Sequence, residues 1–318
     1  KVLEINDSMV SFIDFNDQIR FPAIMDDVKM PHYEIILGDE VQDFSSVQAQ
    51  MVSKMQGRYV FVGDKHQSIY GFRGTMNNSM ALLKEQFNCV EMPLSISYRC
   101  AVSIVNVARE IYPDIESWSE SPQGTVRTVP LSDIYTLPYD KDTLVVCRTN
   151  KPLVDMAFGL LNDGIACHVK GRDIGDGLIK LIKQQDCSTV GGLMNSLELW
   201  LDAEKQKAVA KDRDEIAQRA QDRYNSVQVF AGKCQPSDHP DTVIELIDNL
   251  FEQGHGVCLS TVHKAKGLEA QRCYMLESQL FEHFASRAKQ AWQAEQERNI
   301  KYVAVTRAKT ELVSCALW

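Results

Sequence analysis

Two adjacent carboxylates follow a short apolar run near the beginning of the chain. The stretch "YEIILGDEVQD" covers residues 33–43 and places Asp39 and Glu40 directly after a glycine, with Asp43 three positions later. Carboxylates this close repel one another, so a cation is expected in front of them. The first can hold Mg²⁺, directly or through water, and the second can polarise an attacking water. Alone the pattern is weak, because adjacent acids after a strand more often begin a helix or lie in a solvated loop.

A second apolar run ends in a loop that carries an amide, two aromatic rings and an arginine. This is "YVFVGDKHQSIYGFRG", which ends at residue 74. Gln67 follows the run in a place where it can orient a water or sense a terminal phosphate. Tyr70, Phe72 and Arg73 together resemble a stacking platform for nucleobases. Packing in a core is a plausible alternative for Tyr70, but it fits Phe72 less well because Phe72 lies between a glycine and an arginine.

The elements that must position these residues alternate between strands and helices. Strands are predicted at residues 33–37, 59–62, 144–147, 257–259, 273–276 and 312–316. Helices are predicted at residues 47–55, 80–86, 101–111, 153–161 and 290–304. Several of the strands are continuously apolar, which is typical of parallel strands covered on both faces. The alternation predicts an α/β fold built from βαβ units.

Three more segments complete an ordered set of five. They are "LSISYRC", with Tyr98 and Arg99; "VCLSTVHKAKGLE", with His263 and Glu269; and "ERNIKYVAVTRAKTEL", with Arg307. With "DEVQD" and "GDKHQSIYGFRG", these segments resemble, in order, the motifs of the UvrD/Rep-type DNA helicases of superfamily 1. The resemblance runs from about residue 33 to 312, and "VCRTN" in the second half also looks like an element of that family. Five motifs in register make the resemblance very specific.

The resemblance implies RecA-like parallel sheets flanked by helices, with ATP between two such domains and single-stranded DNA across them. It also implies a role for each matching residue. Asp39 and Glu40 serve Mg²⁺ and water activation, Gln67 contacts the terminal phosphate, Arg99 and Arg307 reach that phosphate from the second domain, Tyr98 stacks on adenine, Glu269 holds the ribose, and Tyr70, Phe72, Arg73 and His263 contact DNA. Many family members have Trp where this chain has Phe72, and Phe retains a stacking face of smaller area.

Two domains are expected. Residues 1–93 would be the end of the first RecA-like domain, and residues 94–318 a complete second one with a helical insertion at about 186–253. Within the insertion, the charged stretch 198–225 is read as a solvated helical face rather than a dedicated binding helix.

One expected motif is absent from the sequence. The phosphate-binding loop G-x-x-x-x-G-K-[ST] does not occur, and the only G-x-x-x-x-G, at residues 159–164, is followed by Ile-Ala. The chain is therefore interpreted as the C-terminal portion of a helicase. The missing N-terminal part of the first RecA-like domain would be its partner, and this chain alone is predicted not to hydrolyse ATP.

Composition narrows the functional classes. The net charge of −9 argues against a general electrostatic grip on duplex DNA but is compatible with single strands held by stacking. Nine cysteines without a C-x-x-C pair favour reduced thiols in a cytoplasmic protein, and no apolar run is long enough to span a membrane. The sequence thus predicts an ATP-dependent helicase or translocase on single-stranded DNA, with 3′→5′ polarity from the resemblance. The alternative is a non-hydrolysing, helicase-like DNA-binding subunit of a larger complex.

Overall fold

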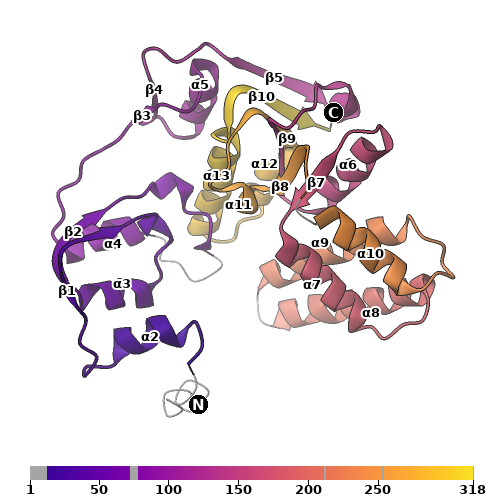
Figure 1. Ribbon diagram of the computed structural model, residues 1–318, viewed down its shortest axis with the longest axis horizontal. Helices are drawn as coiled ribbons and strands as arrows, with labels where there is room; N and C mark the ends of the chain where they lie inside the picture. The colour runs from indigo at the N-terminus through magenta and orange to yellow at the C-terminus, as the bar shows by residue number, and fades with distance from the viewer. Residues whose placement is uncertain (1–12, 72–77, 211–212, 252–253, 318) are drawn as a thin grey trace. The chain divides into compact units, whose positions relative to one another are not determined.

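The computed structural model describes residues 13–71, 78–210, 213–251 and 254–317. The chain divides into two compact units. Unit 1 falls within Lys1–Leu94 and Arg287–Asn299, and unit 2 within Ser95–Ser286 and Ile300–Trp318. Figure 1 traces the chain from unit 1 in indigo to the C-terminal strand in yellow.

Unit 1 is a two-stranded parallel sheet with short helices (Figure 1). Its elements in the first part of the chain are α2 (Asp17–Ile24), β1 (His32–Gly38), α3 (Ser46–Ser53), β2 (Gln56–Phe61) and α4 (Ser79–Gln86). Helix α3 begins at a capping box, in which Ser45 and Gln48 satisfy each other's backbone N–H groups. Val41, Ala49 and Leu83 form a small core against which Phe61 packs.

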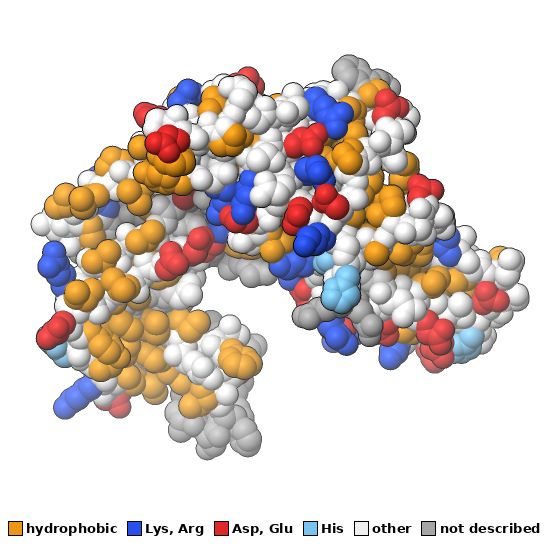
Figure 2. All heavy atoms as spheres, turned by 45° about the horizontal axis from the view of Figure 1, so that its top comes forward, with side chains coloured by type: hydrophobic (Ala, Val, Ile, Leu, Met, Phe, Trp, Pro, Cys, Tyr) orange, Lys and Arg blue, Asp and Glu red, His pale blue; other side chains and the backbone are white. Residues whose placement is uncertain are grey.

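The other face of this sheet is exposed in the part of the chain that the structure describes. Tyr33, Ile35 and Leu37 in β1 are 48%, 55% and 76% exposed, and Val60 and Val62 are also exposed. Alternate residues of a strand share a face, and Leu37 is the register partner of Val60, so these side chains form one apolar surface. Figure 2 shows hydrophobic side chains at the surface of unit 1. The prediction that these strands are covered on both faces is therefore wrong for β1 and β2, because no layer in the described ranges packs on this side.

Unit 2 is built on a six-stranded, all-parallel sheet in the order β5-β10-β9-β6-β8-β7. The elements of unit 2 that precede α7 in the chain are β3 (Ile96–Ser97), α5 (Val102–Ile111), β4 (Glu116–Ser117), β5 (Thr125–Pro130), β6 (Thr143–Cys147), α6 (Lys151–Asn162) and β7 (Cys167–Lys170). The elements from α7 onward are α7 (Arg172–Lys183), α8 (Val190–Ala210), α9 (Asp214–Ala231), α10 (Pro240–Phe251), β8 (Val257–Thr261), α11 (Val262–Ala265), β9 (Ala270–Leu276), α12 (Gln279–Ser286) and β10 (Ala308–Ala316). Helix α13 (Ala291–Val305) begins in unit 1 and ends in unit 2. Strand β6 is buried at every position, as its apolar run predicts. The α/β class and the parallel sheet flanked by helices are thereby confirmed.

The helices between β7 and β8 belong to the core of unit 2. Leu197 and Leu201 of α8 are buried together with Tyr224, Val227 and Phe230 of α9. The stretch read as a solvated helical face divides into α8 and α9, and each of these helices also buries an apolar face. This buried face was not predicted from the sequence, because the high charge of the stretch conceals apolar residues at helical spacing. None of the helices in the described ranges is long and apolar enough to cross a membrane.

Candidate nucleotide site

In unit 1 the candidate residues follow the carboxyl ends of two paired strands. Strand β1 ends at Gly38, directly before Asp39 and Glu40, and Gln67 ends the 3₁₀ turn Lys65–Gln67 that follows β2. Gly38 and Phe61 are register partners, so the two loops leave the sheet side by side. A Cβ atom on Gly38 would lie 2.8 Å from the Phe61 ring, so only glycine permits this approach. The carboxyl end of a parallel sheet is the usual place for a nucleotide in an α/β protein.

Glu40 has a backbone conformation that is uncommon for a residue with a side chain. Its φ of 52° and ψ of 37° lie in the left-handed region. Such a conformation costs on the order of 1 kcal/mol and is typical of functional loops. The Asp39 carboxylate accepts a hydrogen bond from the Glu40 N–H at 2.9 Å, which helps to hold this turn. Both acidic side chains are exposed.

The two carboxylates are compatible with Mg²⁺ bound to a nucleotide. In the described part of the chain there is no group of three or more His, Cys, Asp or Glu that could hold a metal ion by itself. Mg²⁺ normally takes only one or two protein carboxylates and completes its shell with phosphate oxygens and water. Exposed Asp39 and Glu40 fit that donor set and do not fit a closed, all-protein metal cage.

The loop that carries Gln67 is held by polar contacts. The Asp64 carboxylate accepts hydrogen bonds from the His66 N–H at 2.9 Å and from Gln67 Nε2 at 2.8 Å. Asn299 Nδ2 donates to the carbonyl of Ser68 at 2.8 Å, immediately after the turn. These bonds fix the backbone on both sides of Gln67.

Sequence reasoning missed Gln42, which joins the two loops. Its side chain is buried, donates to the Glu40 carboxylate at 2.6 Å and accepts from the Asp64 N–H at 3.1 Å. Its place inside "DEVQD" could have indicated this role, because a buried amide among acidic residues needs a hydrogen-bond partner for its N–H₂ group and another for its oxygen.

Unit 2 brings together residues that are far apart in the sequence. Arg99 Nε donates to Glu269 Oε2 at 2.7 Å, and Lys309 is ion-paired with the same carboxylate. The hydrogen bond from Lys309 and the charge of Arg99 hold the pKa of Glu269 below its ordinary value. Lys309 was also missed by sequence reasoning, although it lies two residues after Arg307. The cluster lies at the beginning of β9 and β10, because Glu269 directly precedes β9 and Lys309 is the second residue of β10.

Arg307 lies inside unit 2 and is only 1% exposed. Its guanidinium donates to the carbonyls of Val303 and Leu268, at 2.9 and 3.0 Å, and to the Thr306 hydroxyl at 3.2 Å. Burial lowers the pKa of Arg307, and the nearby positive charge of Arg99 lowers it further. Its backbone carbonyl accepts the Ala270 N–H at 3.0 Å. Arg307 therefore braces the segment on both sides of Glu269.

An aromatic pair lies beside this cluster. Tyr98 is 71% exposed, and its ring centroid lies 5.9 Å from that of Trp118. The pairing of β3 with β4 places them together, since the Trp118 N–H donates to the Ser97 carbonyl at 3.2 Å. Two exposed rings together offer an apolar face that a nucleobase can cover.

The residues predicted to contact DNA are only partly described. Tyr70 is half-buried at the end of the Gln67 loop, whereas Phe72 and Arg73 lie outside the described residues. His263 is half-buried in α11, which follows the carboxyl end of β8. The structure thus places His263 and Glu269 on the same connection between β8 and β9, toward opposite ends of it.

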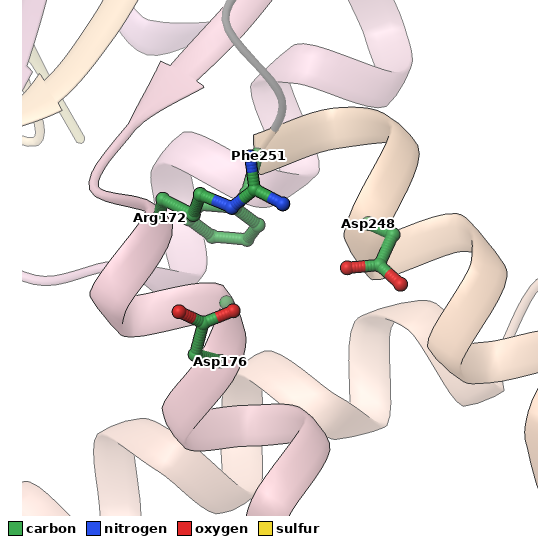
Figure 3. A pocket seen from close by; sticks show the side chains of 5 residues that line it. Arg172, Asp176, Asp248 and Phe251 are labelled. Carbon is green, nitrogen blue, oxygen red and sulfur yellow. The ribbon is translucent and has the colours of Figure 1, made fainter.

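A separate recess in unit 2 lies between α7 and α10 (Figure 3). Arg172 lies near the Phe251 ring, with the carboxylates of Asp176 and Asp248 below it. The recess leaves no room for a ligand, so it is a feature of helix packing and not a binding site.

Comparison with known proteins gives consistent matches in both parts of the chain. Residues 3–88 match the family model of the UvrD/REP helicase N-terminal domain, and residues 204–316 match that of the UvrD-like helicase C-terminal domain. The F-box DNA helicase protein 1 of Schizosaccharomyces pombe is 25% identical over 316 residues, which is 88% of this chain and 34% of that protein.

Bacterial relatives match over shorter stretches. A probable DNA helicase II homolog of Mycoplasma pneumoniae is 30% identical over 99 residues, or 29% of this chain and 14% of that protein. The ATP-dependent DNA helicase Rep of Salmonella typhimurium is 31% identical over 107 residues, or 30% of this chain and 16% of that protein. The chain therefore spans from about a seventh to about a third of the length of these relatives.

Proposed function

Because this chain belongs to the UvrD/Rep family of DNA helicases, we propose that it contributes the water-activating and phosphate-sensing parts of an ATP-driven motor on single-stranded DNA. The observation that carries the proposal is the arrangement in unit 1. Glu40 and Gln67 follow the ends of neighbouring parallel strands and are joined by hydrogen bonds through Gln42 and Asp64. The 3′→5′ polarity rests on the family resemblance alone.

In this proposal the acids of unit 1 act on the nucleotide. Asp39 and Glu40 would hold Mg²⁺, which neutralises charge on the phosphate oxygens when bound. Glu40 polarises the attacking water, and its carboxylate is held by the Gln42 amide. Gln67 senses the terminal phosphate and exchanges its hydrogen bond with Asp64 for one with a phosphate oxygen.

The residues of unit 2 stabilise charge and bind the nucleoside. Arg99 reaches the phosphate by releasing Glu269, and a guanidinium in that role contributes ~10³–10⁵ in rate. Arg307 is the second cation. Its three internal bonds leave two of its five N–H donors for a ligand, and the side chains that cover it must move before it acts. Tyr98 stacks on adenine beside Trp118, and Glu269 turns to the ribose once Arg99 has left it.

Single-stranded DNA is the proposed track. Tyr70, Phe72 and Arg73 would contact it from the end of the Gln67 loop, and His263 from α11. Contacts by aromatic and basic side chains suit single strands, because every base offers a ring face. This arrangement connects phosphate sensing directly to the DNA-binding segment, since only two residues separate Gln67 from Tyr70.

The phosphate-binding loop must come from elsewhere, because the sequence contains none. We place its source on the exposed face of the sheet of unit 1. The exposed side chains of Tyr33, Ile35, Leu37 and Val60 form the kind of surface on which further helices or strands of an α/β domain pack. The missing N-terminal part of the first RecA-like domain, which would carry the loop, is the partner we propose for it.

The test is steady-state ATP hydrolysis with Mg²⁺ and single-stranded DNA. We expect negligible turnover by the 318-residue chain alone, because positioning by a loop of backbone N–H groups is absent. Adding a segment that carries G-x-x-x-x-G-K-[ST] should restore turnover, and Glu40→Gln should abolish it. DNA binding without hydrolysis in the reconstituted protein would favour the non-hydrolysing subunit instead. Robust turnover by the chain alone, abolished by Glu40→Gln, would contradict the assignment of the missing loop.

A further inference from the structure

The side chain of Gln42 connects the two catalytic loops of unit 1. We propose that Gln42 is a positioning residue that couples the Glu40 carboxylate to Gln67, so that water activation responds to phosphate sensing. The inference rests on the proposed function, and it assigns a role to a residue outside the predicted set.

The geometry of the Gln42 amide admits one orientation. Nε2 donates to Glu40 Oε2 at 2.6 Å, and Oε1 accepts from the Asp64 N–H at 3.1 Å. A carboxylate only accepts hydrogen bonds and a backbone N–H only donates them, so turning the amide over would break both bonds. With 2% of the residue exposed, water has little access to replace either partner.

The path continues through Asp64 to Gln67. The Asp64 N–H is held by Gln42, and the Asp64 carboxylate accepts from Gln67 Nε2 at 2.8 Å. When Gln67 turns to a phosphate, the Asp64 carboxylate loses one of its two donors, keeps the His66 N–H, and shifts toward it. The Asp64 N–H then moves relative to Gln42, and the amide that holds the Glu40 carboxylate moves with it. Chains of such bonds polarise one another, which strengthens the coupling.

Gly63 makes room for this path. A Cβ atom at this position would lie 2.4 Å from Gln42 Oε1 and 3.2 Å from a methyl group of Val41. No side chain fits there without displacing the amide. The close approach is a second observation, independent of the hydrogen bonds, that the backbone is shaped around the Gln42 side chain.

Backbone contacts hold the same loops together without the amide. The Val41 N–H donates to the Val62 carbonyl at 3.1 Å, and the Ser68 hydroxyl donates to the Gln42 carbonyl at 3.3 Å. A variant that lacks only the Gln42 amide therefore keeps the connection between the loops. This makes Gln42→Met, which retains the length of the side chain and removes both polar groups, a usable test.

Gln48 provides a matched control in the same unit. Its Oε1 accepts from the Ser45 N–H at 2.8 Å in the capping box of α3, and the hydrogen bonds of this capping box do not involve Asp64 or Glu40. Gln48→Met removes an amide whose oxygen accepts hydrogen bonds from the N–H and the hydroxyl of Ser45, and it costs about 1 kcal/mol of stability. A loss of activity caused by reduced stability alone would therefore occur in both variants.

The experiment measures DNA-stimulated ATP hydrolysis by the protein expressed from its natural reading frame. Gln42→Met should lower kcat at least ~10-fold with a much smaller change in KM for ATP, because it displaces the water-activating carboxylate while Asp39 still holds Mg²⁺. Gln48→Met should leave both values unchanged. The double variant Gln42→Met/Gln67→Ala should be no slower than Gln67→Ala, since both changes interrupt one path.

Two results would overturn the inference. One is a kcat for Gln42→Met equal to that of Gln48→Met, and the other is a double variant whose loss is the product of the two single losses. Absence of hydrolysis by the wild-type protein would instead reject the proposed function, and with it any catalytic role for the path. Hydrogen exchange then decides whether the path exists in the 318-residue chain: Gln42→Met should speed exchange at the Asp64 amide, and unchanged exchange would refute the hydrogen bonds themselves.

Discussion

Arg307→Ala should destabilise the fold of unit 2 even where no nucleotide is present. Its side chain is 1% exposed and donates three hydrogen bonds, to Val303, Leu268 and Thr306. Arg99 provides the comparison, because its side chain is 39% exposed and is held by one ion pair with Glu269. The two arginines were predicted to share a function, but the structure gives them different surroundings.

The magnitude follows from these contacts. Hydrogen bonds from a charged group contribute ~1.5–3 kcal/mol each, so three contribute roughly 5–9 kcal/mol. Removing a buried cation recovers several kcal/mol of desolvation. The net loss for Arg307→Ala is about 3 kcal/mol, which lowers the Tm of a domain of this size by ~6–12 °C. An exposed ion pair contributes ~0–1 kcal/mol, so Arg99→Ala should lower the Tm by at most ~4 °C.

Thermal unfolding of the 318-residue chain, followed by circular dichroism, measures both variants. The lower Tm of Arg307→Ala should be accompanied by faster hydrogen exchange in residues 268–270, which its side chain braces. Arg307→Lys should recover only part of the loss, because an ammonium lacks the planar fork of a guanidinium. If Arg307→Ala unfolds at the same temperature as Arg99→Ala, the guanidinium is not buried in solution and the reasoning fails.

Three further results are expected. Phe72→Ala should weaken binding of single-stranded DNA by ~1–3 kcal/mol in a fluorescence titration at fixed salt, and unchanged affinity would reject stacking. Arg99→Ala should sharply lower DNA-stimulated kcat while ATP affinity falls much less, and near-normal turnover would refute its role. Glu269→Gln should lower the free energy of unfolding by at most ~1 kcal/mol at neutral pH, and so should lower the Tm slightly. Because Lys309 and Arg99 lower the pKa of Glu269, this difference should vanish as the pH falls through that lowered pKa, and a difference that persists in acid would contradict it.

Most secondary structure was predictable because its signals are local. The apolar runs at residues 144–147 and 257–259 are strands in the buried sheet of unit 2, since a run of that length without turn residues has few alternatives. Helix α7 was missed because Gly175 and Gly177 interrupt its pattern. A Cβ atom on Gly175 would lie 3.0 Å from Phe251, so that glycine permits close packing against α10, which no local pattern reveals.

The types of the site residues were also readable from the sequence, but their partners were not. The carboxylates after an apolar run and the arginines of the later segments are assigned to phosphate chemistry through the resemblance of the five motifs. The pairing of Arg99 with Glu269 joins residues 170 positions apart, and no spacing rule predicts it. The buried amide of Gln42 was likewise missed, because its role depends on Asp64 in another loop.

The sequence by itself determined the α/β class, the order of the motifs and the membership of the UvrD/Rep family. The α/β class depends on periodicity within each segment, and the family membership depends on the resemblance of five motifs in order. Only the tertiary structure decided that the apolar face of β1 is exposed among the described residues, that Arg307 is enclosed while Arg99 is exposed, and that one amide joins Glu40 to the Gln67 loop. Burial and hydrogen-bond partners are decided by which segments pack together, and a linear pattern does not contain the distances between them.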